Sequence, residues 1–92
     1  MRLKNKLGEY CERLNQCLPV KSQNDIDSLN NILTEAVENI PGYNLFWHRD
    51  IFLDCNGDNE KMRNLVAKTD KVHFEVSDDI EEHIGVIVKY NE

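Results

Sequence analysis

The chain has few of the features that mark secreted and membrane proteins. It carries only three cysteines, an odd number without the paired spacing of a disulfide framework. No apolar run approaches the roughly 20 residues that a membrane span requires. The basic start, residues 1–6, is followed at once by polar residues where a signal peptide would continue with apolar ones. We therefore expect one acidic domain, residues 1–92, in the reducing cytoplasm and not at a membrane.

Positive charge is scarce in most of the chain. The net charge is −6 over 92 residues, yet residues 1–24 hold five Lys/Arg against two acids, and residues 25–92 hold six against fifteen. Between Val72 and Val88 there is no Lys or Arg. A protein that binds DNA or RNA needs basic groups that displace counterions from phosphate. Direct nucleic-acid binding is therefore not expected.

Motifs for metal binding are also missing. His48, His73 and His83 and the three cysteines have neither the C-x-x-C nor the H-x-x-x-H spacing of a zinc site. A calcium loop starting at Asp54 would need Gly at its sixth position and Glu at its twelfth. Those positions hold Asn59 and Leu65. We expect no metal ion and no cofactor.

The sequence also shows no complete set of catalytic residues. His48-Arg49-Asp50 matches the core of a kinase catalytic loop, but the glycine-rich loop and the lysine of a kinase are absent. A Cys55 nucleophile with His48 as its base has no evident oxyanion hole. Glu81 and Glu82 are candidates for an acid–base pair. They lie in a predicted exposed loop, however, where no neighbouring group would give them the different pKa values that such a pair needs. We expect a protein that is not an enzyme.

Two helices are predicted in the first half of the chain. Apolar residues recur at spacings of three and four over the first 18 positions, and Pro19 ends this pattern. A second helix is predicted from a cap at Ser22 or Asn24 to the stop at Pro41-Gly42. Its apolar face consists of Ile26, Leu29, Ile32, Leu33, Ala36, Val37 and Ile40.

The second half favours strands. Residues 43–54 are rich in aromatic and β-branched residues, which indicates one strand or a hairpin that turns at residues 48–50. A continuous strand would place Leu45, Trp47, Ile51 and Leu53 on one apolar face, and Arg49 on that face conflicts with it. Asp58 is a predicted cap for a short third helix. Alternation over Val72–Val76 and Ile84–Tyr90 predicts an antiparallel hairpin with residues 78–83 as its loop. We expect an α+β fold in the order α-α-β-α-β-β, with two layers and helices on one face of an antiparallel sheet of three or four strands.

Acidic residues cluster around the predicted hairpin loop. Five carboxylates fall within eight residues. Five more, Asp50, Asp54, Asp58, Glu60 and Asp70, extend the set if the middle strand ends nearby. The alternative is that these acids only keep the protein soluble. A surface with charges of one sign is destabilised by their mutual repulsion, however, and it attracts a basic partner during association. The predicted partner-binding residues are Glu75, Asp78, Asp79, Glu81, Glu82, Asp54, Asp58 and Glu60.

In length, acidic charge and mixed α+β outline, the chain resembles the small anti-restriction proteins and other DNA mimics with which phages and plasmids block DNA-binding enzymes. The resemblance implies an inhibitor that occupies the basic DNA-binding surface of a restriction enzyme, a nucleoid protein or another DNA-binding protein. Carboxylates on one face of a strand lie ~6.5 Å apart, close to the separation of neighbouring phosphates. The first helix is basic, so a mimic surface is not expected to wrap the whole molecule.

Toxin-neutralising immunity proteins and antitoxins have a similar build, and the alternative function is direct binding of a toxin. Homodimerisation through a sheet edge is a further expectation. The last predicted strand, Ile84–Tyr90, is apolar, and Lys89 is its only charged residue that would oppose pairing of an exposed edge with another chain.

Overall fold

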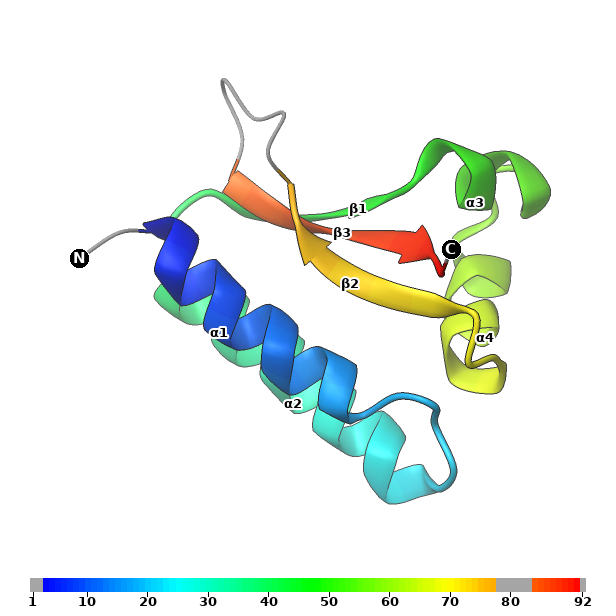
Figure 1. Ribbon diagram of the computed structural model, residues 1–92, viewed down its shortest axis with the longest axis horizontal. Coiled ribbons are helices and arrows are strands. Elements are labelled where there is room, and N and C mark those ends of the chain that lie inside the picture. The colour runs from blue at the N-terminus through cyan, green and yellow to red at the C-terminus, as the bar shows by residue number, and fades with distance from the viewer. Residues whose placement is uncertain (1–2, 78–83, 92) are drawn as a thin grey trace.

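A pair of long helices precedes a three-stranded sheet in the computed structural model, which describes residues 3–77 and 84–91 (Figure 1). Two shorter helices lie between the first and second strands. The elements are α1 (Leu3–Gln16), α2 (Gln23–Asn39), β1 (Tyr43–Trp47), α3 (Arg49–Asp54), α4 (Asn59–Lys68), β2 (Val72–Val76) and β3 (Ile84–Tyr90). The predicted α+β class is confirmed, and both predicted long helices are present.

The α1–α2 hairpin forms where the apolar periodicity predicts it. Ser22 caps α2 by accepting a hydrogen bond from the backbone N–H of Asp25. Arg13 of α1 pairs with Glu35 of α2 at 2.5 Å, which ties the polar edges of the two helices together. The side chains that this hairpin buries are Leu7, Tyr10, Cys11, Leu14, Leu29, Ile32, Ala36 and Ile40.

Residues 43–54 are neither one strand nor a hairpin. Strand β1 stops at Trp47, and His48 caps α3 by accepting a hydrogen bond from the backbone N–H of Asp50 at 3.2 Å. Ile51 and Cys55, four positions apart, are both buried, which is a helical spacing. Arg49 is exposed in this helix, so its conflict with an apolar strand face disappears.

The sheet has the order β1-β3-β2 and is mixed, so the prediction of an antiparallel sheet is wrong. Strands β2 and β3 form the predicted antiparallel hairpin, but β1 runs parallel to β3. The reason is the long crossover through α3 and α4, which returns the chain along the far edge before β3 fills the centre. Strand β3 is therefore central, and the prediction that it presents an exposed edge is wrong; homodimerisation through a sheet edge stays a prediction.

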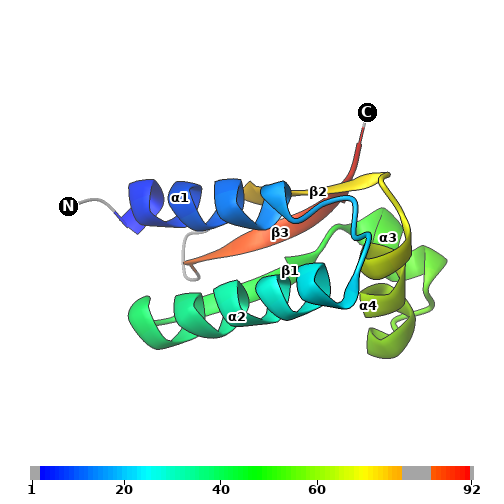
Figure 2. The same ribbon diagram turned by 90° about the horizontal axis from the view of Figure 1, so that it is seen from below.

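The core lies between the α1–α2 hairpin and one face of the sheet, which confirms the two layers. Figure 2 looks onto the helical layer, with α1 over β2 and α2 along β1. Val86 and Val88 of the central strand have no exposed surface. Strand alternation turns a second set of side chains to the opposite face of the sheet: Asn44, Phe46, His73, Glu75, Ile87 and Lys89.

Helix α4 begins as predicted. Its cap, Asp58, accepts hydrogen bonds from the backbone N–H groups of Glu60 and Lys61 at 2.9 and 3.2 Å. Met62 and Val66, one turn apart, are buried. Among the described residues, no helix combines the length and apolar character needed to cross a bilayer.

Candidate partner-binding surface

The predicted acidic residues fall into three groups. Asp78, Asp79, Glu81 and Glu82 lie outside the described residues, as does the whole predicted loop 78–83. Glu75 lies on β2, on the sheet face that the helices leave open. The third group joins the end of α3 to the start of α4, and its members are Asp54, Asp58 and Glu60.

Glu75 belongs to a polar network with His73 and the cation Lys89. Its carboxylate hydrogen-bonds to Nε2 of His73 and lies 3.7 Å from Nζ of Lys89 on the neighbouring strand. The hydrogen bond from His73, with the charge of Lys89, holds the pKa of Glu75 below its usual range. Nδ1 of His73 contacts Oδ1 of Asn91 at 2.6 Å. Glu75 thus has two partners, His73 on its own strand and Lys89, a cation that lies just outside the 72–88 window of the sequence.

Asp54 is fixed at the opposite end of β3. The hydroxyl of Tyr90 donates a hydrogen bond to Oδ2 of Asp54 at 2.8 Å. This bond raises the pKa of Tyr90 to about 12, with smaller contributions from burial and from nearby charges that include Asp50. The chain leaves β2 at Ser77 and enters β3 at Ile84, at the other end of this seven-residue strand. A strand of this length spans about 20 Å, so Asp54 and the ends that flank segment 78–83 are well separated.

Two apolar side chains are exposed among these acids. Phe52 is 49% exposed and Leu53 is 59% exposed, whereas Ile51 beside them is fully buried. The ring of Phe52 lies over Gly57, where a Cβ would come within 3.1 Å of it. Gly57 also has a φ of +71°, a conformation that suits glycine, so the α3–α4 turn places this ring.

We call this set the α3 surface; it comprises Asp50, Phe52, Leu53, Asp54, Asp58 and Glu60. All six residues are exposed. In the described part of the chain, none of its four carboxylates has a Lys or Arg nitrogen within 4.0 Å; Asp50 lies 3.6 Å from His48. Exposed apolar side chains rimmed by polar ones are typical of protein–protein contacts.

Sequence reasoning missed Phe52 and Leu53 because it assigned them to a strand, with Leu53 on its buried face. The signal that could have found them is the capping pair His48 and Asp50, followed by Ile51 and Cys55 at helical spacing. That pattern turns Phe52 and Leu53 away from the core.

The three cysteines and the two described histidines, His48 and His73, form no metal-binding cluster. Cys11 and Cys55 are buried, and burial raises the pKa of the Cys11 thiol to about 11. Within residues 3–77 and 84–91, no three His, Cys, Asp or Glu side chains form a group that could hold a metal ion. Comparison of the chain with protein-family models, with curated proteins and with solved structures finds no match.

Proposed function

We propose that this protein is a non-enzymatic acidic inhibitor that binds the basic, nucleic-acid-contacting surface of another protein through its α3 surface. The observation that carries the proposal is the arrangement of four exposed carboxylates around Phe52 and Leu53 without a described Lys or Arg partner. Carboxylates left unpaired in the free protein are available to the basic groups of a partner.

Two of these carboxylates are held in place before any partner arrives. Asp54 accepts the hydrogen bond of Tyr90, and Asp58 accepts two backbone hydrogen bonds at the start of α4. Side chains that are already ordered lose less conformational entropy on binding. A fixed row of negative groups is also the physical basis of DNA mimicry, because it can occupy sites that hold phosphates.

The exposed apolar pair supports a second candidate function, that of an immunity or antitoxin protein. Phosphate-contacting surfaces are polar, whereas a tight protein inhibitor is anchored by apolar side chains in a desolvated centre. Phe52 and Leu53 would supply that anchor. In both functions the partner is a basic protein and the inhibitor acts in the cytoplasm, without direct contact to nucleic acid.

The test is capture of partners from a bacterial lysate, followed by displacement with duplex DNA. We expect the captured proteins to be basic and nucleic-acid-binding, and duplex DNA to release them. The variant Asp50→Asn/Asp54→Asn/Glu60→Gln should bind at least about tenfold more weakly, because charged interface groups contribute 2 kcal/mol or more each when desolvated. Asp58 is left unchanged because it caps α4.

The matched control removes the same number of charges elsewhere. Glu12, Asp27 and Glu38 are exposed on α1 and α2, and the variant Glu12→Gln/Asp27→Asn/Glu38→Gln should retain binding. Equal loss in both triple variants would mean that net charge, and not the α3 surface, determines binding.

The effects of salt concentration and of a Phe52 substitution on binding affinity distinguish the two candidate functions. A DNA mimic should lose affinity steeply between about 50 and about 500 mM salt, since screening shortens the reach of its charges. An immunity-type interface should lose less with salt and more with Phe52→Ala. Circular dichroism of each variant checks that it folds.

A further inference from the structure

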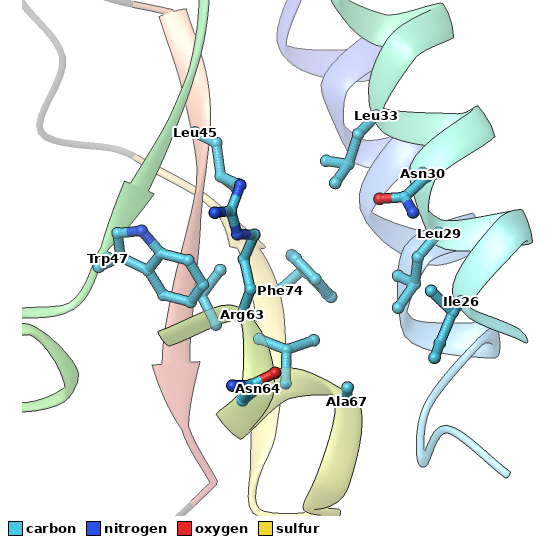
Figure 3. A pocket seen from close by; sticks show the side chains of 12 residues that line it. Ile26, Leu29, Asn30, Leu33, Leu45, Trp47, Arg63, Asn64, Ala67 and Phe74 are labelled. Atoms are coloured by element: carbon cyan, nitrogen blue, oxygen red, sulfur yellow. The ribbon is translucent and has the colours of Figure 1, made fainter. Parts of the chain in front are cut away.

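A pocket of about 270 Å³ lies between α2, α4 and the sheet (Figure 3). Its walls are mostly apolar. Leu29 and Leu33 of α2 line one side, and Leu45, Trp47 and Phe74 of the sheet line the other. Concave apolar sites with a few polar groups are the usual form of small-molecule sites in proteins. The pocket shares no residue with the α3 surface, so this inference is independent of the proposed function.

Polar groups at the pocket come from three residues. Asn30 of α2 and Arg63 and Asn64 of α4 line it together with the apolar side chains. Figure 3 shows the Arg63 side chain extended from α4 along the sheet, and the amide of Asn30 turned from α2 toward the same space. The polar side chains, all three exposed, therefore border the apolar pocket from both α2 and α4.

Arg63 has no carboxylate partner within the described part of the chain. Among the described cations, Arg13 pairs with Glu35 at 2.5 Å and Lys89 lies 3.7 Å from Glu75, and the others have no such partner. Of the cations without a partner, the exposed Arg63 is the one that lines the pocket. In a chain with 17 acidic residues and 11 basic ones, a guanidinium beside an apolar pocket is left without an internal counter-ion. A guanidinium presents two parallel N–H groups that match the two oxygens of a carboxylate.

We propose that this pocket binds a small amphiphilic carboxylate, with its apolar tail among the side chains of α2 and the sheet and its carboxylate on Arg63. The pocket has the volume of about nine water molecules, at ~30 Å³ each. That volume suits a ligand of about ten non-hydrogen atoms, the size of a medium-chain carboxylate. Asn30 lines the same pocket and offers a further polar group to the ligand.

The experiment uses octanoate as the probe and Trp47 as the reporter. Trp47 is the single tryptophan of the chain and lines the pocket, so its fluorescence reports on occupancy. Titrations with 1-octanol and octylammonium, which carry the same chain with a neutral and a cationic head, complete the series. We expect saturable binding in the order octanoate, 1-octanol, octylammonium. Protein NMR chemical shifts follow the same titrations, so binding that leaves the fluorescence unchanged is still detected.

Variants locate the head group. Arg63→Gln should weaken octanoate binding at least about tenfold, since a charge-assisted hydrogen bond is lost, and should leave 1-octanol binding within about twofold. Lys61→Gln is the matched control, because Lys61 is an exposed cation on the same helix and does not line the pocket. Ala67→Leu, which fills the pocket, should weaken all three probes.

Three results would overturn the proposal. The first is no saturable octanoate binding by fluorescence or by NMR. The second is equal affinity for octanoate and octylammonium. The third is an octanoate affinity that Arg63→Gln and Lys61→Gln change to the same extent, with thermal unfolding showing that both variants are folded.

Discussion

The side chain of Asn15 and the backbone of Phe74 form a reciprocal pair of hydrogen bonds. The amide nitrogen of Asn15 donates to the carbonyl of Phe74 at 2.9 Å, and the amide oxygen of Asn15 accepts from the N–H of Phe74 at 2.7 Å. Strand β2 is an edge of the sheet, and edge strands present unpaired backbone groups to other chains. The α1 side chain thus occupies backbone groups at one edge, so strand-to-strand dimerisation is better expected at β1.

Replacing Asn15 should destabilise the protein. Asn15→Ala removes both hydrogen bonds and leaves a partly buried donor and acceptor without partners, which costs about 1–3 kcal/mol. Urea denaturation followed by circular dichroism measures the change. Gln16→Ala, at the exposed neighbouring position, should change the unfolding free energy by less than about 0.5 kcal/mol. Similar values for the two variants would show that the Asn15 pair does not stabilise the edge.

Gly85 and Gly8 should respond in opposite directions to alanine. A Cβ at Gly85 would come within 2.2 Å of the backbone oxygen of Asn44 and 2.6 Å of the Phe46 ring, so strands β1 and β3 must separate. We expect Gly85→Ala to destabilise the fold by about 2–4 kcal/mol. A Cβ at Gly8, within α1, meets no atom within 4 Å, and Gly8→Ala should stabilise by up to about 1 kcal/mol. Thermal unfolding of both variants is the measurement, and a stable Gly85→Ala protein would contradict the close approach of β1 to β3.

The Glu75 network predicts a contribution to stability that disappears in acid. The pKa of Glu75 is lowered in the folded state, first by the hydrogen bond from His73, so the ionised carboxylate favours folding. This contribution is fully present above the unfolded value of 4.5 and is lost as the pH falls through the lower folded value. Because Glu75 is well exposed, the effect should stay below about 1 kcal/mol.

Unfolding free energies of the wild type and of Glu75→Gln, measured from pH 7 to pH 3, test this dependence. The difference between the two proteins should shrink toward zero at the acid end. A difference that stays constant with pH would mean that Glu75 stabilises by packing and not by charge.

The three thiols should differ in reactivity. Burial raises the pKa of Cys11 to about 11, so only about 0.1% of this thiol is ionised at pH 8, and the core also shields it. Cys55 is buried as well, whereas Cys17 is only half-buried. We expect iodoacetamide to modify Cys17 first, with Cys11 and Cys55 reacting only after unfolding. Mass spectrometry of the labelled peptides gives the order, and early labelling of Cys11 would contradict its burial in the core.

The elements that the sequence predicts are those with strong local signals. Ser22 and Asp58 act as the caps that their positions indicate, and the alternation of β2 and β3 produces the expected hairpin. Residues 48–54 were misassigned because aromatic content outweighed the cap at His48. The parallel pairing of β1 with β3 depends on where the crossover returns, and no local pattern records it.

The candidate sites, like the fold, were only partly predictable from local sequence. Asp54, Asp58 and Glu60 were found by charge alone and lie on adjoining segments of α3 and α4. Glu75 was grouped with them by its place in the sequence, yet its environment is set by Lys89 on another strand. The pocket at Arg63 could not be predicted, since its walls come from helices and strands that are distant in the sequence.

The central position of β3 also determines the order in which the protein can fold. Strands β1 and β2 do not pair with each other, so neither has a ladder partner until β3 arrives between them. Tyr43 pairs with Ile84, 41 positions later, and closing so long a segment is a slow, entropically costly step. The α1–α2 hairpin is built from local contacts and should therefore form first. Its apolar side stays exposed until the sheet forms, so the chain is prone to aggregate during this step of folding.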